Sequence, residues 1–165
     1  MTTVIAEPVV VSHDVTADQV RVLVGDCSPE TLRRRFFLPA ALEAGEVFRR
    51  YRRFLLIGPP SGASVLATVG SRPVGLLNLV AVGDRLVEVG LLVADPWQRR
   101  GIATHLLASE LARPRWAGWT VRATVQADNQ AARRLLFDPL RGRPRRSTAG
   151  GAELTVEVVV PEARR

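Results

Sequence analysis

The 165-residue chain contains no lysine, only one cysteine and no long apolar segment. Cys27 has no second cysteine with which to form an intramolecular disulfide, so a reducing, cytoplasmic setting is expected. No run of about 18 uncharged apolar residues occurs, so no transmembrane helix is expected. Residues 1–8 lack the basic-then-apolar order of a signal peptide. We therefore expect one globular domain over residues 1–165, with 161–165 as a flexible tail and no membrane association.

The chain is strongly positive, with a formal net charge of +7, because its 23 basic residues outnumber its 16 acidic ones. All of the basic residues are arginine. Such a chain is compatible with nucleic-acid binding. A coding bias that replaces lysine by arginine explains the same composition, and it fits the dispersal of the arginines among acidic residues. Part of the positive charge would also suit a phosphate-rich ligand.

The most informative stretch runs from residue 86 to residue 107. The apolar run Leu86–Val93 predicts a buried strand, which Asp95-Pro96 ends because proline has no N–H to donate. Apolar residues then recur at helical spacing from Ile102 onward. A helix that begins directly after a tight turn offers unpaired N–H groups and the positive end of its dipole. The turn is therefore a candidate anion site, for which phosphate is the usual ligand.

The turn itself, Gln98-Arg99-Arg100-Gly101-Ile102-Ala103, resembles the Q/R-x-x-G-x-G/A signature of the GNAT family of N-acetyltransferases. The resemblance implies acetyl-CoA as co-substrate, with its pyrophosphate held by Gln98, Arg99, Arg100, Gly101, Ile102, Ala103 and Thr104. It also implies an α/β (α+β) fold: a mixed, mostly antiparallel central sheet with helices on both faces and a splay between its two central strands. An ordinary basic turn between a strand and a helix is the alternative.

The resemblance extends to residues that would hold the pantetheine arm. Leu91, Leu92 and Val93 would border it, and one of their N–H groups could polarise the thioester carbonyl. Asn129 opens the string Asn129-Gln130-Ala131-Ala132, which matches the family's N-x-x-A/S pattern; helix capping is its alternative role. Leu136 stands where many relatives carry a tyrosine that protonates the leaving thiolate, so the source of that proton is left open.

Glu88 is the only charged residue within the predicted strand 86–93, and a carboxylate in an apolar strand is unusual. An alkylamine is mostly protonated at neutral pH, so its acetylation requires a group that removes a proton. Partial burial would make Glu88 a stronger base, and related protein acetyltransferases place a glutamate at this position. A structural ion pair with Arg85 or Arg72 is the alternative.

The segment Ser28-Pro29-Glu30-Thr31-Leu32-Arg33-Arg34-Arg35-Phe36-Phe37 resembles a string that lies beside the acceptor-amine site in some bacterial protein acetyltransferases. Phe36 and Phe37 are therefore candidates for acceptor binding, or else core residues of an amphipathic helix. We interpret the three arginines as solvated.

Outside the central stretch, periodicity and turn residues predict the remaining elements. The strand at 120–125 follows a strand–helix crossover and should lie parallel to the central strand. Residues 139–151 are expected as a basic loop that could hold a short strand. Helices are expected over 14–24, 28–37, 43–56, 102–111 and 129–137, and further strands over 9–11, 65–69, 74–82 and 152–160.

These patterns predict an acetyl-CoA-dependent N-acetyltransferase that works by direct transfer in a ternary complex, without a metal. Cys27 is a poor candidate for a covalent acetyl carrier because no neighbouring histidine is implied. The acceptor is a protein lysine or a small-molecule amine, and the resemblance of residues 28–37 favours protein. The rivals are a non-catalytic acyl-CoA-binding module and a nucleic-acid-binding protein. The acyl-chain preference and the oligomeric state stay open.

Overall fold

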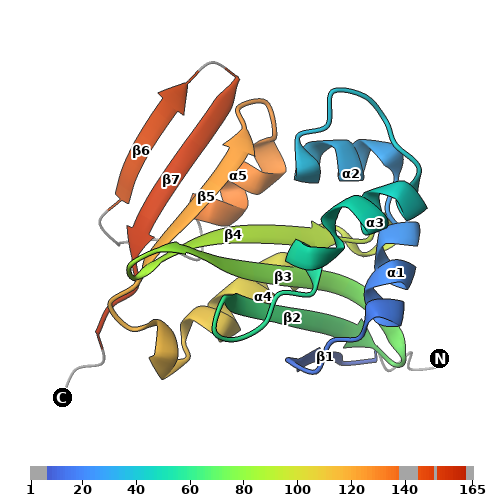
Figure 1. Ribbon diagram of the computed structural model, residues 1–165, viewed down its shortest axis with the longest axis horizontal. Helices are drawn as coiled ribbons and strands as arrows, with labels where there is room; N and C mark the ends of the chain where they lie inside the picture. Colours follow the sequence, from blue (N-terminus) through green and yellow to red (C-terminus); the bar gives the residue numbers. More distant parts are fainter. Residues whose placement is uncertain (1–6, 138–144, 151, 163–165) are drawn as a thin grey trace, which may run out of the picture.

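The computed structural model describes residues 7–137, 145–150 and 152–162 (Figure 1). Its centre is one seven-stranded sheet in the order β1-β2-β3-β4-β5-β7-β6. Neighbouring strands are antiparallel except β4 and β5, which are parallel as the crossover predicted. The strands are β1 (Val9–Ser12), β2 (Gly62–Val69), β3 (Arg72–Gly83), β4 (Leu86–Val93), β5 (Thr120–Gln126), β6 (Arg145–Gly150) and β7 (Glu153–Val159).

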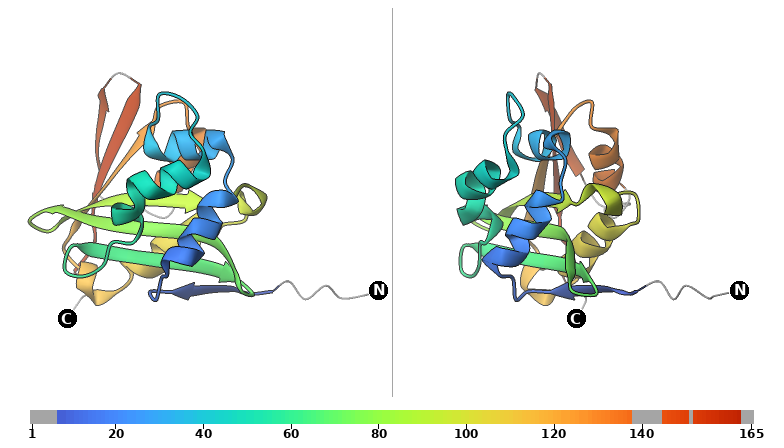
Figure 2. Two further views of the ribbon diagram at one scale, coloured as in Figure 1. Left: turned by 45° about the vertical axis from the view of Figure 1, so that its right-hand side comes forward. Right: turned by 90° about the vertical axis from the view of Figure 1, so that its right-hand side faces the viewer.

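Helices cover both faces of the sheet (Figure 2). On one face lie α1 (Ala17–Gly25), α2 (Pro29–Phe36) and α3 (Ala44–Leu55); on the other lie α4 (Ile102–Leu111) and α5 (Gln130–Phe137). The start of α2 follows the sequence prediction, because Ser28 accepts a hydrogen bond from the Thr31 N–H and Pro29 occupies the first turn. The mixed sheet with helices on both faces is confirmed.

The two faces of the central strands pack against two different apolar clusters. Val87 is buried in the cluster that α4 covers, and Val89, Leu91 and Val93 pack against the same cluster. Leu92 is buried in the cluster beneath α1, α2 and α3. Since successive side chains of a strand point to opposite faces, Glu88 and Gly90 share the face of Leu92. These two residues therefore lie on the side of the sheet that carries α2 and α3.

The expected splay lies between β4 and β5. Among the described residues these strands pair at only three positions, Leu86 with Thr120, Val87 with Val121 and Glu88 with Arg122. Beyond that point β4 stays paired with β3 and β5 stays paired with β7, so the sheet divides (Figure 1). Glu88 and Arg122 are thus the last pair before the opening.

The start of β2 differs from the sequence prediction. The strand expected at 65–69 begins at Gly62, because Gly62 and Ala63 already pair with Val80 and Leu79. A Cβ at position 62 would lie 2.0 Å from the Leu79 carbonyl oxygen, so this close pairing requires glycine. In the segment 139–151, expected as a loop that could hold a short strand, that strand is β6, which pairs with β7; residues 139–144 and 151 lie outside the described residues. Of the expected tail, residues 163–165 lie outside the described residues.

Neither a membrane-spanning helix nor a metal cluster is found in the described part of the chain. Across residues 7–137, 145–150 and 152–162, each helix is too short or too polar to cross a bilayer. The same residues contain no group of three histidine, cysteine, aspartate or glutamate side chains placed to hold a metal ion.

Candidate active site

The basic turn between β4 and α4 is built on two residues with left-handed backbone conformation. Arg99 has a φ of 61° and Gly101 a φ of 78°. Gly101 is the N-cap of α4 and provides no side chain to cap it. The first hydrogen bond of the helix runs from the His105 N–H to the Gly101 carbonyl, at 2.9 Å. The N–H groups of residues 102–104 therefore have no acceptor within the helix and are available to an anion.

Two side chains of the turn are engaged elsewhere. The Gln98 amide donates to the Thr31 hydroxyl at 3.1 Å and to the Val93 carbonyl at 3.0 Å, which ties the turn to α2 and to the end of β4. Ile102 is buried against Gly75 of β3, where a Cβ would come within 2.8 Å of it. Backbone groups, together with the charges of Arg99 and Arg100, are thus what this turn offers a ligand.

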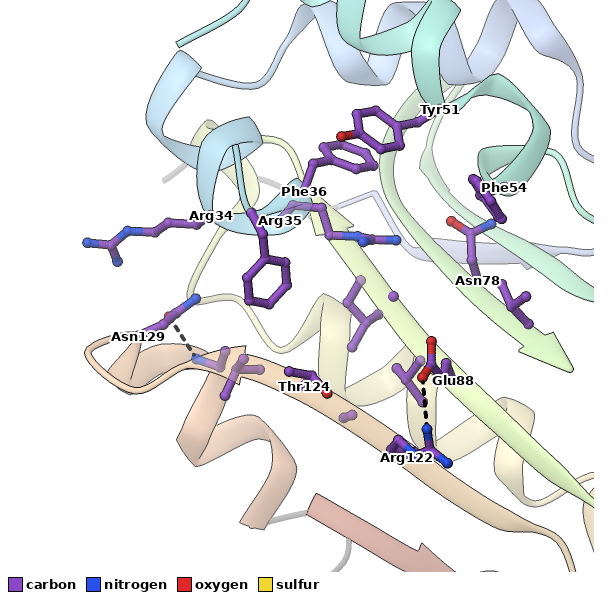
Figure 3. A pocket seen from close by; sticks show the side chains of 18 of the residues that line it. Arg34, Arg35, Phe36, Tyr51, Phe54, Asn78, Glu88, Arg122, Thr124 and Asn129 are labelled. Carbon is purple, nitrogen blue, oxygen red and sulfur yellow. Dashed lines mark hydrogen bonds and ion pairs between the residues drawn. The ribbon is translucent and has the colours of Figure 1, made fainter. Parts of the chain in front are cut away.

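A cavity of about 400 Å³ occupies the opening between β4 and β5 (Figure 3). It brings together five residues singled out from the sequence: Phe36, Phe37, Glu88, Leu91 and Asn129. Leu92 is not among its lining residues, because its side chain is packed in the cluster beneath α1, α2 and α3 and is 2% exposed. The cavity is lined from α2, α3, β3, β4, β5 and α5.

The family follows from a comparison with known protein families. Residues 29–136 match the model of the acetyltransferase (GNAT) family. The chain belongs to the GNAT family. No curated protein matches its sequence.

Solved structures share the GNAT fold at low sequence identity. The GNAT domain of S. lividans PAT is 22% identical, with a TM-score of 0.71, covering 92% of this chain and 89% of that one. The yncA structure from Salmonella typhimurium, with its cofactor acetyl-CoA, is 11% identical, with a TM-score of 0.66 and 95% of each chain covered. Diaminobutyrate acetyltransferase EctA from Paenibacillus lautus is 18% identical, with a TM-score of 0.63, covering 93% of this chain and 96% of that one.

Glu88 in this GNAT chain is more exposed than its strand predicted. The side chain is 48% exposed, and its Oε1 accepts a hydrogen bond from Arg122 Nη1 at 3.2 Å. About half of the side chain is accessible because Glu88 belongs to the last β4–β5 pair, where the sheet opens. The proposed structural partners lie elsewhere: Arg85 donates to the Ala117 carbonyl, and Arg72 pairs with Asp26.

Asn129 and the two phenylalanines line the cavity in different ways. The Asn129 Oδ1 accepts the Ala132 N–H at 3.2 Å, so the capping role is present beside its place in the cavity wall. Phe36 stacks on Tyr51 with ring centroids 4.4 Å apart. Phe37 ends α2 with a φ of 54° and is 38% exposed. Phe36 therefore supports the wall, whereas the Phe37 ring is accessible.

Several cavity residues of this GNAT site were not singled out from the sequence. Asn78 had a usable signal, since it is a polar residue inside an apolar strand; its amide donates to the Leu55 carbonyl and to Ser64. The solvated arginines are confirmed for Arg33 and Arg34, which bind Glu30, but not for Arg35, whose Nε is buried. Arg35, Tyr51, Asn78 and Arg122 are among these missed residues, and each takes part in a polar or aromatic contact.

Proposed function

We propose that this GNAT protein is an acetyl-CoA-dependent N-acetyltransferase that transfers the acetyl group directly to a primary amine in a ternary complex. The observation that carries the proposal is the opened edge of β4. One end of that edge leads to the free N–H groups of α4, and the other ends at the Glu88 carboxylate in the cavity. The structure of yncA with acetyl-CoA supports acetyl-CoA as the donor, and that of EctA with diaminobutyric acid and coenzyme A supports an amine as the acceptor.

The donor would lie along β4. The N–H groups of residues 102–104, with Arg99 and Arg100 beside them, would hold the pyrophosphate. Past the last β4–β5 pair, the edge of β4 that faces the opening has no strand partner in the described chain. Its backbone groups can bond the pantetheine amides as an added strand would, and one N–H can polarise the thioester carbonyl. Asn129 bounds the opposite side of the cavity.

Glu88 would act as the base. The attacking nitrogen forms a bond to the thioester carbon, its excess proton passes to the Glu88 carboxylate, and the C–S bond breaks to release the CoA thiolate. Direct transfer is favoured because Cys27 cannot serve as an acetyl carrier: burial raises the pKa of its thiol to about 12. The Leu136 side chain, at the position of the usual tyrosine acid, lies outside the described part of the structure.

The variant Glu88→Gln tests this role. We expect acetyl-CoA affinity, measured by calorimetry, to stay within about twofold, and turnover to fall on the order of 100-fold or more, the scale of general base catalysis. Glu157→Gln is the matched control, because Glu157 binds the same Arg122 at 3.1 Å but is not among the residues that line the cavity. Near-normal turnover of Glu88→Gln would show that the carboxylate is structural.

The acceptor is a protein lysine or a small-molecule amine, and a panel of both kinds tests the activity itself. Acetyl-CoA binding without acetylation of any amine would identify a non-catalytic acyl-CoA-binding module instead. Salt-dependent DNA binding without CoA binding would identify a nucleic-acid-binding protein.

A further inference from the structure

Arg35 lines the cavity but has no role in the acetyl transfer proposed above. It lies at the end of α2, and its guanidinium extends into the cavity over β4 (Figure 3). A Cβ at position 90 would lie 1.9 Å from Arg35 Nη2 and 2.5 Å from Cζ. The guanidinium therefore occupies the space that a side chain at position 90 would fill, and only glycine allows it to lie there.

The charge of Arg35 has no counterion in the described part of the chain. Its Nε is buried without a hydrogen-bond partner, and none of the ion pairs found there includes Arg35. The Phe36 ring, 4.8 Å from Cζ, contacts it through a cation–π interaction. Burial lowers the pKa of Arg35 to about 10, so it remains a cation at neutral pH. A partly buried cation whose Nε is removed from water without a partner costs stability.

The other charges around the cavity do not neutralise this one. Three arginines, Arg34, Arg35 and Arg122, line the cavity, against one carboxylate, Glu88. Glu88 is bonded to Arg122, and Arg34 is bonded to Glu30 outside the cavity. An acceptor that enters as a simple ammonium ion would meet an uncompensated positive charge. An acceptor that also carries an anion would neutralise it.

Glu88 and Gly90 set the spacing of such an acceptor. They are two residues apart on the same face of β4, a distance of about 7 Å between Cα atoms in an extended strand. The Glu88 carboxylate and the Arg35 guanidinium over Gly90 thus lie along one wall of the cavity. A molecule with an amine and a carboxylate a few bonds apart can reach both, and guanidinium–carboxylate pairs favour two parallel hydrogen bonds.

We infer that the acceptor of this enzyme is an amine that carries a carboxylate, with Arg35 binding the carboxylate while the amine faces Glu88. The inference rests on the proposed acetyltransferase function and adds the substrate class. Arg35 is a specificity-determining residue in this scheme, and Gly90 is the position that makes room for it.

Matched substrate pairs test the inference. Acetylation is measured for 3-aminopropionate, 4-aminobutyrate and 5-aminopentanoate, each against the alkylamine of the same length without a carboxylate. In the wild type, kcat/KM should be about 10-fold or more higher for the best carboxylate than for its alkylamine, the scale of a hydrogen bond to a charged group. Lysine peptides with an acidic or a neutral neighbouring residue distinguish a protein carboxylate from that of a free amino acid.

The variant Arg35→Met should remove the preference, through loss of the carboxylate substrate rather than of the alkylamine. Arg33→Met is the matched control on the same helix, because Arg33 pairs with Glu30 and does not line the cavity; it should keep the preference. Gly90→Ala leaves the residue at position 35 unchanged, but its new methyl group displaces the Arg35 guanidinium. This variant should therefore weaken the preference as well.

A stability measurement separates this role from a structural one. Since the guanidinium lacks a counterion, Arg35→Met should unfold at the same or a higher temperature than the wild type in the absence of ligand. Marked destabilisation, a loss of acetyl-CoA affinity, or equal kcat/KM for both members of each pair would overturn the inference. Calorimetry of 4-aminobutyrate and butylamine on the CoA-loaded protein gives the same comparison without turnover. Failure to acetylate any amine would instead contradict the proposed function, while this binding comparison still decides the role of Arg35.

Discussion

Cys27 is buried beside the end of β4, and its environment disfavours ionisation. Its Sγ donates to the Leu23 carbonyl at 3.3 Å. Burial, with the carboxylates of Asp95 and Asp26 acting in the same direction, raises the pKa of the thiol to about 12. The thiolate is the reactive form of cysteine, so this thiol is unreactive at neutral pH.

The raised pKa of Cys27 predicts a specific loss of stability in alkali. An unfolded cysteine ionises near pH 8.5, whereas the folded one stays protonated to about pH 12. The folded state thus binds more protons in this window, and its stability is full below pH 8.5 and declines as pH rises, by up to about 1.4 kcal/mol per pH unit. Urea unfolding of wild type and Cys27→Ala at pH 7, 9 and 10 measures this. The wild type should lose more stability than the variant, and parallel losses would contradict the prediction.

The sequence reveals single residues of the site when their signal is local. Glu88 stands out because every neighbour in its strand is apolar, and Gly101 because the turn needs it. Arg35 does not, because it is one of three consecutive arginines, and only the fold shows that Gly90 leaves space for that guanidinium. Arg122 becomes informative only through its register opposite Glu88. Residues defined by contacts across distant strands cannot be recognised from composition or spacing.

Among the elements, the turn into α4 shows how a short motif fixes a binding geometry. Gly101 takes a φ of 78° with no atom within 4 Å of a Cβ placed there, so the position is open in space but restricted in backbone conformation. Asparagine tolerates this conformation better than other residues with a side chain. The same position therefore allows two substitutions with opposite expectations.

The Gly101→Glu variant should lose acetyl-CoA affinity by at least tenfold, because a carboxylate would lie beside the N–H groups that we propose bind pyrophosphate. The Gly101→Asn variant keeps the turn without the negative charge and should retain most of the affinity. Calorimetry with acetyl-CoA measures both, and circular dichroism checks that the fold is intact. If Gly101→Glu bound acetyl-CoA normally, the pyrophosphate site would have to lie elsewhere.

Long periodic elements are predictable from this sequence because their patterns are unambiguous. The strand predicted at Leu86–Val93 has the same bounds as β4, and the helix after the turn begins at Ile102 as expected. The start of β2 was misplaced because Gly62 and Ala63 resemble a loop locally, yet pair with β3. The left-handed Arg99 was not predicted either, since non-glycine residues rarely adopt that conformation.

At the scale of the whole molecule, the sheet consists of two parts joined at a narrow seam. β1 to β4 form one part and β5 to β7 the other, and the described residues of β4 and β5 pair only from Leu86 to Glu88. The ion pair between Glu88 and Arg122 closes this seam at 3.2 Å. A ligand bound in the opening would contact both parts and add interactions that the free protein lacks.

Acetyl-CoA should therefore raise the stability of the whole molecule and reduce the local opening of the strands that border the cavity. At about 100 times its dissociation constant, a ligand specific for the folded state adds about 2.7 kcal/mol, which corresponds to a rise in Tm of about 5–10 °C for a chain of this size. Thermal unfolding with acetyl-CoA, CoA and longer acyl-CoAs measures this rise and the acyl-chain preference together.

Hydrogen exchange should show the largest added protection in β4 beyond Glu88, in β5 beyond Arg122 and at the start of α4, with little change in β1 and β2. Gly101→Glu is the negative control, and a Tm rise without protection along the opening would mean that the ligand binds away from the splay.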